Sequence, residues 1–491
     1  MQCKLIFLFL VLSMLCGCRG EEAAKSEPVD KEVADAPRQK GCAACHPAVV
    51  LAVPHDLACV DCHRGDAEGD RPETAHQGLV ARPAHPDHML AACGACHGDI
   101  VRESADSLHF TLRNEVNLVR GHFGASDPLQ SLTEIPVAPA PATPLELADD
   151  MLRRRCLRCH VYTPGDDYPL TRRGTGCAAC HLAFAEGKPL SHQLLAKPTD
   201  RQCLGCHYGN VVGADYYGRY EHDYHWEYRT PYVTREPYIR AYGVEYHDLV
   251  PDIHQQRGLA CIDCHRGHQL MAGGRNSLTC ATCHRAPQNG NEPLPDNVVR
   301  DNGALLLTSP LDGKEHVIPP LTHPAHARYG RQVACQVCHA QWGFNDSTTH
   351  LLRSDTDVFW DWERLTVQGS AEVERLLEHN LNSGKEELPP KMRDGVTGEE
   401  RPGVWYQGFT QRRWEDLHIR RDSDGVIKVF RPVLDLRLSA VASDDTVLLD
   451  NAAGREPGLL PYTPHTTGAA GLFYENRFAG LLEPPAPAGS K

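Results

Sequence analysis

The chain has 491 residues, a length that corresponds to two or three compact units. Hydrophobic residues make up 41% of it and aromatic residues 7%, which is a lean composition for this size. The formal net charge of −14 excludes a typical nucleic-acid-binding surface and favours partners that present basic patches. Two counts are unusual, the 21 cysteines and the 28 histidines.

The first 17 residues have the features of an export signal. Lys4 provides a small positive charge, and residues 5–15 form an apolar run that is too short for a membrane-spanning helix. The run closes with Leu15-Cys16-Gly17-Cys18, which resembles a bacterial lipobox with Cys18 as the acceptor. We therefore predict a lipoprotein signal peptide over 1–17 and lipidation at Cys18. The alternative is an ordinary signal peptide that is cut nearby.

Residues 18–40 are charged or small and contain almost no apolar side chains. This composition predicts a flexible tether. A bacterial lipoprotein carries more than one acyl chain, which is enough to hold a protein stably on a bilayer. We therefore expect an extracytoplasmic, lipid-anchored protein at a bacterial membrane, with the outer membrane favoured, on its periplasmic or external face.

Eighteen of the cysteines fall into nine Cys-x-x-Cys-His units, and the other three lie in the first 18 residues. The paired cysteines are Cys42 and Cys45, Cys59 and Cys62, Cys93 and Cys96, Cys156 and Cys159, Cys177 and Cys180, Cys203 and Cys206, Cys261 and Cys264, Cys280 and Cys283, and Cys335 and Cys338. The histidines that follow them are His46, His63, His97, His160, His181, His207, His265, His284 and His339. We call these units motifs 1 to 9 in chain order.

This unit is the attachment signature of c-type haem. Each thiol bonds one vinyl group on the edge of the haem ring, and the adjacent histidine then binds the iron as its proximal ligand. A zinc site would need four ligands per metal and would not require a histidine directly after every cysteine pair. A disulfide framework would give the histidines no role. The sequence therefore predicts nine covalently bound haem c groups.

The motifs form three groups of three, and each group opens with a closely spaced pair. We assign haem group 1 to residues 41–136, a Pro/Ala-rich linker to 137–150, haem group 2 to 151–260 and haem group 3 to 261–340. A helix is expected over 145–157 because this stretch leads into motif 4. So many motifs in so short a stretch predict short helices and irregular loops wrapped around a core made of haem.

Residues 341–491 contain no motif and are predicted to form a small haemless C-terminal domain with some β-strands. The Asp422-Ser423-Asp424-Gly425 turn precedes an alternating stretch at 426–430, and 434–441 and 446–449 are two further candidate strands. The Pro/Ala-rich end from residue 484 is expected to be loose. The domain could cap the last haem, dock a partner or stabilise the fold.

The second axial ligand of most irons is expected to be histidine. Removal of the leader leaves only Met89, Met151, Met271 and Met392, which are too few for nine irons. Bis-histidine ligation gives closed, low-spin sites of generally low potential. The preferred distal candidates, chosen for lying near a motif, are His55, His85, His88, His254, His323 and His326. The others considered are His76, His109, His122, His192, His222, His225, His247, His268, His316 and His350.

The stretch 216–246 holds nine of the 16 tyrosines, interleaved with histidines and arginines. At an open haem these side chains could bind and protonate a small oxyanion. The favoured alternative is structural, with tyrosines packed on haem faces and arginines paired with haem propionates. Nitrite-reducing multihaem enzymes typically have a Cys-x-x-Cys-Lys unit at the active haem, and this chain has none.

With the motifs placed, the chain resembles multihaem c-type cytochrome lipoproteins of metal-respiring bacteria, particularly those of outer-membrane electron conduits. The Tyr-rich stretch that runs into His254 and Cys261, and the Pro-Tyr-Thr-Pro-His-Thr-Thr-Gly run at 461–468, are similar to cytochromes associated with selenite or tellurite reduction. Such relatives are expected to carry another haem motif soon after that run. This chain does not, and His465 could instead reach back to a haem as a distal ligand.

The resemblance implies electron transfer along mostly bis-histidine haems in an extracytoplasmic respiratory pathway, to an external metal or metalloid acceptor. It implies other multihaem cytochromes or a quinol-oxidising complex as electron donors, and a porin-like outer-membrane barrel as a further partner. No nucleic acid partner is expected. An electron carrier is favoured over an enzyme. The alternative is a terminal reductase of nitrite, selenite or tetrathionate type with one open haem.

Overall fold

The structure is a computed structural model that describes residues 41–47, 49, 53–185, 188–208, 213–221, 246–272, 278–285, 294–343, 345–346, 349–365, 368–382, 384, 386–408, 412–413, 417–455 and 458–482. The predicted signal peptide, the tether and Cys18 lie outside these residues, as do 222–245 of the Tyr-rich stretch and the Pro/Ala-rich end. Within these ranges, no helix is long and apolar enough to cross a membrane.

Eight of the nine motifs lie in or at the edge of an α-helix, which is four or five residues long in every case except the 17-residue helix of motif 3. One helical turn places residues three apart on the same face, so a short helix is enough to bring the two cysteines of a motif together. The helices are α1 (Cys42–Cys45), α2 (Cys59–His63), α4 (Met89–Ala105), α8 (Ala178–His181), α9 (Asp200–Leu204), α11 (Cys261–Cys264), α13 (Cys280–His284) and α15 (Cys335–His339).

Motif 4 differs, because it lies in a π-helical turn, η2 (Leu152–Cys156), followed by a 3-10 turn, η3 (Leu157–Cys159). The helix α7 (Pro144–Met151) leads directly into η2. It begins inside the range assigned to the linker because Thr143 and Glu146 form a capping box and Pro144 occupies the first turn. The helix expected over 145–157 is therefore present, with its last turns distorted around motif 4.

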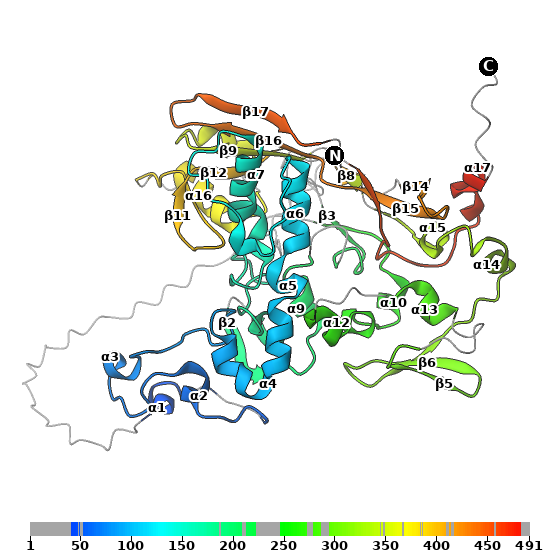
Figure 1. The fold of residues 1–491 in the computed structure, drawn as a ribbon, viewed down its shortest axis with the longest axis horizontal. Coiled ribbons are helices and arrows are strands. Elements are labelled where there is room, and N and C mark those ends of the chain that lie inside the picture. Colours follow the sequence, from blue (N-terminus) through cyan, green and yellow to red (C-terminus); the bar gives the residue numbers. More distant parts are fainter. Residues whose placement is uncertain are drawn as a thin grey trace, which may run out of the picture.

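The remaining helices are short connections. They are α3 (Pro72–Ala75), α5 (Leu108–Thr111), α6 (Arg113–His122), α10 (Ile253–Gln256), α12 (Gly267–Met271), α14 (Pro324–Tyr329), α16 (Ala371–Asn382) and α17 (Ala479–Leu482), with 3-10 turns at Leu132–Glu134, Trp360–Leu365 and Tyr474–Arg477. Figure 1 shows α4, α5 and α6 as a column that connects the motif 1–3 region to the C-terminal strands. The expectation of short helices and irregular loops is confirmed.

The largest sheet has four strands in the order β12-β9-β16-β17. Its strands are β9 (Thr349–Ser354), β12 (Val404–Gln407), β16 (Leu436–Val441) and β17 (Val447–Ala453), and β9 pairs with β16 in parallel. A three-stranded sheet joins β14 (His418–Arg421), β15 (Ile427–Pro432) and β18 (Leu459–Pro461). The three strands predicted between 426 and 449 correspond to β15, β16 and β17.

The other strands form small antiparallel ribbons. They are β1 (Leu182–Ala185) with β2 (Lys188–Leu194), β3 (Arg219–Glu221) with β4 (Tyr246–Asp248), β5 (Val298–Asp301) with β6 (Ala304–Thr308) and β7 (Glu315–Ile318), β8 (Asn345–Asp346) with β13 (Arg412–Arg413), and β10 (Lys391–Arg393) with β11 (Glu400–Pro402).

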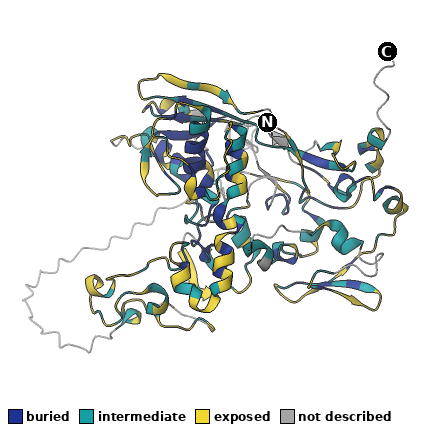
Figure 2. Cartoon of the chain, in the orientation of Figure 1, coloured by how far each residue is buried: buried dark blue, intermediate teal, exposed yellow. Residues whose placement is uncertain are grey.

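The main hydrophobic core lies between the four-stranded sheet and helices from two other parts of the chain. Val116 of α6 and Leu147 of α7 are fully buried against Trp405 of β12 and Leu438 of β16, together with Leu377 of α16. Figure 2 shows the buried residues gathered in this region, whereas the helices of motifs 1–3 are largely half-buried or exposed. The C-terminal strands therefore share their core with the segment that leads into motif 4.

Candidate haem-binding sites

Motifs 2 to 9 each lie close in space to at least one other motif. Thiols interact between seven pairs of motifs: Cys62 with Cys93, Cys93 with Cys177, Cys180 with Cys203 and Cys206, Cys159 with Cys206, Cys203 with Cys261, Cys264 with Cys283, and Cys280 with Cys335. These contacts give the order 2-3-5-6-7-8-9. Motif 4 lies beside motif 6, because the Cys206 thiol is 3.2 Å from the Cys159 carbonyl oxygen.

Among the described residues, no disulfide joins the cysteines. In the part of the chain that the structure describes, no three His, Cys, Asp or Glu side chains converge as a group that could hold a metal ion. What converges instead are histidines in pairs.

Seven of the nine motif histidines face a second histidine at a nearly constant spacing. Their ring centroids lie 6.1–6.3 Å apart, and the planes of the two rings differ by 14° to 83°. With the motif histidine first, the pairs are His46 with His76, His63 with His192, His97 with His55, His207 with His109, His265 with His465, His284 with His254, and His339 with His326.

A shared metal explains this spacing better than direct ring contact does. Rings in direct contact change their separation with their tilt, as in the stacked Trp362 and Tyr406 at 4.2 Å and the edge-on His122 and Phe123 at 4.9 Å. The seven histidine pairs keep one separation at every tilt. His323 and His326, which include no motif histidine, lie 6.3 Å apart as well, so the separation is informative only together with the presence of one motif histidine in each pair. Two imidazoles that bind one metal from opposite sides, each with its nitrogen about 2 Å from the metal, bring their centroids to about 6 Å. The donor set therefore fits an iron between two histidines.

Several of these imidazoles are oriented by a hydrogen bond from Nδ1 to a backbone carbonyl. His63 donates to Val80 at 2.9 Å, and His339 donates to Gly468 at 2.9 Å. His109 and His284 make the same type of bond, to Leu270 at 3.2 Å and Pro319 at 3.3 Å. A proton on Nδ1 leaves Nε2 as the nitrogen with a free lone pair, which is the tautomer that a metal ligand needs.

Three of the six preferred distal candidates lie against a motif histidine, namely His55, His254 and His326. Three are placed otherwise. The Nε2 of His85 is 3.2 Å from the Tyr162 carbonyl, and its ring lies beside that of His88 at the start of α4. His323 caps α14, with Nδ1 accepting a hydrogen bond from the Ala325 backbone.

The other four partners are His76, His109, His192 and His465, none of which was preferred from the sequence. His192 lies on β2 and reaches motif 2, and His109 lies on α5 and reaches motif 6. Proximity to a motif in sequence could not identify them, because the fold brings them in from distant segments. One of the four was indicated by the sequence in another way, because the Pro-Tyr-Thr-Pro-His run at 461–465 pointed to His465 as a distal ligand.

Motif 4 is the exception to this arrangement. His160 is fully buried, its Nε2 donates to the Gly395 carbonyl at 3.0 Å, and its Nδ1 accepts from the Tyr162 backbone N–H at 3.1 Å. Burial lowers the pKa of His160 to about 4, so the ring stays neutral. Both ring nitrogens are thus occupied by protein groups, with the tautomer opposite to that of His63 or His339. In this arrangement His160 is not placed as an axial ligand.

The segment around motif 4 is fixed by buried charges. Arg153 and Asp394 form an ion pair at 2.7 Å with both side chains almost fully buried, and Arg154 and Asp150 form another at 3.5 Å. Arg155 donates to the Gln407 side chain at 2.8 Å. Buried ions need such partners, because an unpaired one is strongly destabilising.

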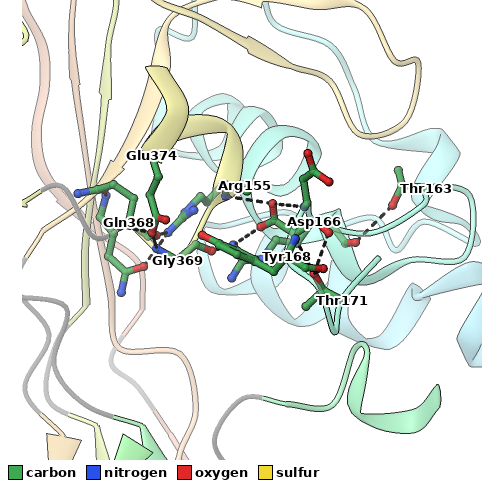
Figure 3. Close-up of polar contacts among 12 residues, drawn as sticks. Arg155, Thr163, Asp166, Tyr168, Thr171, Gln368, Gly369 and Glu374 are labelled. Carbon is green, nitrogen blue, oxygen red and sulfur yellow. Dashed lines mark hydrogen bonds and ion pairs between the residues drawn. The ribbon is translucent and has the colours of Figure 1, made fainter. Parts of the chain in front are cut away.

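Figure 3 shows further polar contacts between the segment around motif 4 and residues 368–374. Arg155 also bonds the Gln368 carbonyl, and the Asp166 carboxylate accepts from the Ala371 backbone N–H at 3.0 Å at the start of α16. The carboxylate of Glu374 in turn accepts from the backbone of Gln368 at 3.1 Å. Motif 4 is therefore held by the C-terminal part of the chain.

Motif 5 shares the common tautomer, because the Nδ1 of His181 donates to the Leu195 carbonyl at 2.7 Å. Among the described residues, no second imidazole pairs with its ring. His222 and His225 lie outside those residues, and the side chain of His247 is likewise not described. At the edge of the same stretch, Tyr216 donates to the Leu259 carbonyl at 2.5 Å and Tyr217 to the Asp200 carboxylate at 2.6 Å.

Comparison with known proteins gives a limited but consistent result. No protein-family model matches the chain, and no solved structure gives a significant match. A protein named cytochrome c-552 from Parabacteroides distasonis is 27% identical over 164 residues, which are 30% of this chain and 30% of that protein. Another of the same name from Bacteroides thetaiotaomicron is 24% identical over 243 residues, 44% of this chain and 42% of that protein. The chain thus spans less than half the length of these relatives, and the similarity supports a multihaem c-type cytochrome with covalently bound haem.

Proposed function

We propose that this chain is an extracytoplasmic electron-transfer protein that holds nine haem c groups, one at each motif. The observation that carries the proposal is the set of seven imidazole pairs at 6.1–6.3 Å, each containing one motif histidine. The 18 motif cysteines would provide the covalent attachment, and the motif histidines other than His160 the proximal ligands.

Haem iron supplies one-electron chemistry, changing between its ferric and ferrous states. The protein contributes the order of the sites. Because thiols of neighbouring motifs are close along the order 2-3-5-6-7-8-9, the attachment edges of successive groups would also be close. At the seven paired sites, the two imidazoles would hold the iron from both sides and leave no open position for a substrate, which suits electron transfer rather than bond-making chemistry.

The proposed setting is a bacterial membrane surface. Cys18 would carry the lipid anchor, residues 18–40 the tether, and the outer membrane is the favoured location. Electrons would arrive from another multihaem cytochrome or a quinol-oxidising complex and leave to a metal or metalloid acceptor, directly or through a cytochrome held in a porin-like barrel. The net charge of −14 favours partners with basic docking patches and predicts that association weakens with salt.

The test is a haem count together with low-temperature EPR on the oxidised, full-length protein. Intact mass and haem absorbance should give nine haems per chain, and at least seven ferric irons should be low-spin. Magnetic measurements are needed beside EPR, since coupling between neighbouring irons can hide signal. A chain that matures without covalent haem, or with mostly high-spin iron, would contradict the proposal.

The arrangement of motif 4 favours a second candidate function. Because both nitrogens of His160 are engaged by Gly395 and Tyr162, a haem at Cys156 and Cys159 would lack its motif ligand and could bind a small oxyanion. Adding nitrite, and separately selenite, to the oxidised protein tests this. A high-spin signal that shifts with either anion, and that is lost in Cys156→Ala/Cys159→Ala, would establish a reductase site at motif 4. Nine low-spin irons that ignore both anions would exclude it.

A further inference from the structure

Asp252 is a buried carboxylate placed directly on one of the paired imidazoles. It is 3% exposed and precedes α10 as its N-cap. Its Oδ1 accepts from the backbone N–H of His254 at 2.8 Å and also from the Nδ1 of the same residue at 2.8 Å. The first bond caps the helix, and the second fixes the ring of His254, which faces His284 of motif 8.

The other oxygen of Asp252 is held from the far end of the chain. Its Oδ2 accepts from the Thr467 backbone N–H at 2.6 Å and from the Thr467 hydroxyl at 2.7 Å. The Thr467 carbonyl in turn accepts from the Ile253 backbone N–H at 2.7 Å. The carboxylate therefore cannot turn away from His254 without breaking these contacts.

The neighbours of Thr467 touch the histidines of the adjacent motifs. His465 faces His265 of motif 7, and the Gly468 carbonyl accepts from Nδ1 of His339 in motif 9. Three residues of the stretch 465–468, namely His465, Thr467 and Gly468, thus contact the imidazoles or the imidazole partners of motifs 7, 8 and 9. The partners differ in charge, because the group on His339 is a neutral carbonyl and the group on His254 is a carboxylate.

This difference has a direct electronic consequence. A carboxylate draws the Nδ1 proton of an imidazole more strongly than a carbonyl does, and so makes the opposite nitrogen a better electron donor. A more basic ligand stabilises ferric over ferrous iron and lowers the reduction potential. Burial of the Asp252 carboxylate, whose side chain is 4% exposed, strengthens the effect because solvent screens its charge less, although the His254 side chain is 42% exposed.

We propose that Asp252 is a positioning residue that makes the haem between His254 and His284 the low-potential site among motifs 7, 8 and 9. The inference rests on the proposed function, since it requires haem at these motifs. Motif 8 lies between motifs 7 and 9 in the row, through Cys264 with Cys283 and Cys280 with Cys335. Electrons passing between motifs 7 and 9 would therefore have to cross an energetically uphill site.

The experiment is a spectroelectrochemical titration of the full-length haem-loaded protein and of Asp252→Asn. Asparagine can still accept the Nδ1 proton through its oxygen but carries no charge. We expect unchanged haem content and low-spin EPR. The motif 8 haem, whose ligand His254 is bonded directly, should shift most to a more positive potential, and the motif 7 haem, whose His465 is also near the Asp252 charge, should shift less. Thr467→Val removes the hydroxyl that donates to the Asp252 carboxylate. The carboxylate should then accept more strongly from His254, and the potential of the motif 8 haem should become more negative.

Asp424→Asn is the matched control, since it removes one carboxylate from an exposed turn and should shift no haem. Full haem content with unchanged potentials in Asp252→Asn would overturn the inference and leave the proposed function standing. If the motif 8 haem shifted by the same amount in Asp252→Asn and in Asp424→Asn, the inference would also be overturned, because the shift would then reflect the change in net charge and not the contact with His254. Failure of the unmodified protein to hold haem at motif 8 would instead contradict the proposed function.

Discussion

His465 has the longest path in sequence to its partner, and it shows what a single side chain contributes to a haem site. Its ring lies 6.2 Å from that of His265 at an angle of 26°, although 200 residues separate the two. It follows the last described strand of the three-stranded sheet, so the C-terminal strands position it. A ligand supplied in this way depends on the fold being complete.

Replacement of His465 should therefore change one haem and no other. In the haem-loaded protein, we expect His465→Ala to convert one low-spin ferric iron to high-spin, because the second axial position of the motif 7 haem loses its imidazole. EPR and the absorbance of high-spin ferric haem measure the change. The matched control is His323→Ala, which removes a preferred sequence candidate that caps α14 and should leave the number of low-spin irons unchanged. The reverse result for these two variants would contradict the pairing.

The partners that could be predicted from the sequence are those close to a motif. His326 precedes motif 9 by less than one short helix and loop, and His254 lies a short distance before motif 7, although it pairs with motif 8. The same rule selected His85 and His323, which bond backbone groups instead. His192 and His109 could not be selected, because only the packing of β2 and α5 brings them to motifs 2 and 6.

Helix α7 shows how local sequence and tertiary packing combine at the level of one element. Thr143 accepts from the Glu146 backbone N–H at 3.2 Å, and the Glu146 carboxylate accepts from the Thr143 backbone N–H at 3.1 Å. We expect Thr143→Ala to lower the free energy of unfolding by about 0.5–2 kcal/mol, as for other lost N-caps. Denaturant unfolding measures it. Thr133→Ala, at an exposed 3-10 turn, should change stability by less than about 0.5 kcal/mol.

The junction of motif 4 with the β10–β11 ribbon rests on Asp394. Burial alone would raise the pKa of Asp394, but hydrogen bonds from Arg153 and from the backbone of Thr397 and Val396 bring that pKa below its ordinary value. Asp394→Asn leaves the buried Arg153 without its counter-charge, and we expect a loss of about 3–5 kcal/mol in unfolding free energy.

The same pKa shift gives the pH dependence its sign. A carboxyl with a lowered folded-state pKa stabilises the fold above its unfolded pKa, about 3.9 for Asp, and this contribution is lost as the pH falls through the folded value. In Asp394→Asn, the free energy of unfolding should therefore fall less steeply as the pH is lowered through the folded-state pKa of Asp394. The control is Asp99→Asn, which breaks an exposed pair with Arg102 and should cost no more than about 1 kcal/mol. Equal losses in the two variants would show that the buried pair has no special role.

For the sheets of the whole molecule, the local sequence pattern predicted where some strands lie but not which strands pair with each other. The turn at 422–425 and the alternation after it predicted β15, and the next two apolar stretches predicted β16 and β17. The parallel pairing of β9 with β16 was not predictable, because a parallel neighbour distant in sequence leaves no local signal. The shared core was missed for the same reason, since Leu147 and Trp405 meet only in the fold.

This shared core decides what removal of the C-terminal region should do to the whole molecule. A chain that ends at residue 340 keeps all nine motifs but loses His465, the Gly468 carbonyl on His339 and the Gly395 carbonyl on His160. It also exposes the apolar faces of α6 and α7, which are fully buried against the sheet at Val116 and Leu147. Exposed apolar surface of this extent favours aggregation.

We therefore expect the chain truncated at 340 to be poorly soluble, to melt at a lower temperature and to lose low-spin haem at motif 7. Sedimentation, thermal unfolding and EPR on the truncated and the full-length haem-loaded proteins measure these changes. A chain that ends at residue 482 is the matched control, because it retains every described contact. If the shorter chain were instead soluble, with unchanged melting and an unchanged number of low-spin haems, the C-terminal region would be a separate module that neither stabilises the rest of the chain nor supplies a ligand. Since the region supplies ligands and core together, we expect stability and ligation to be lost in the same step.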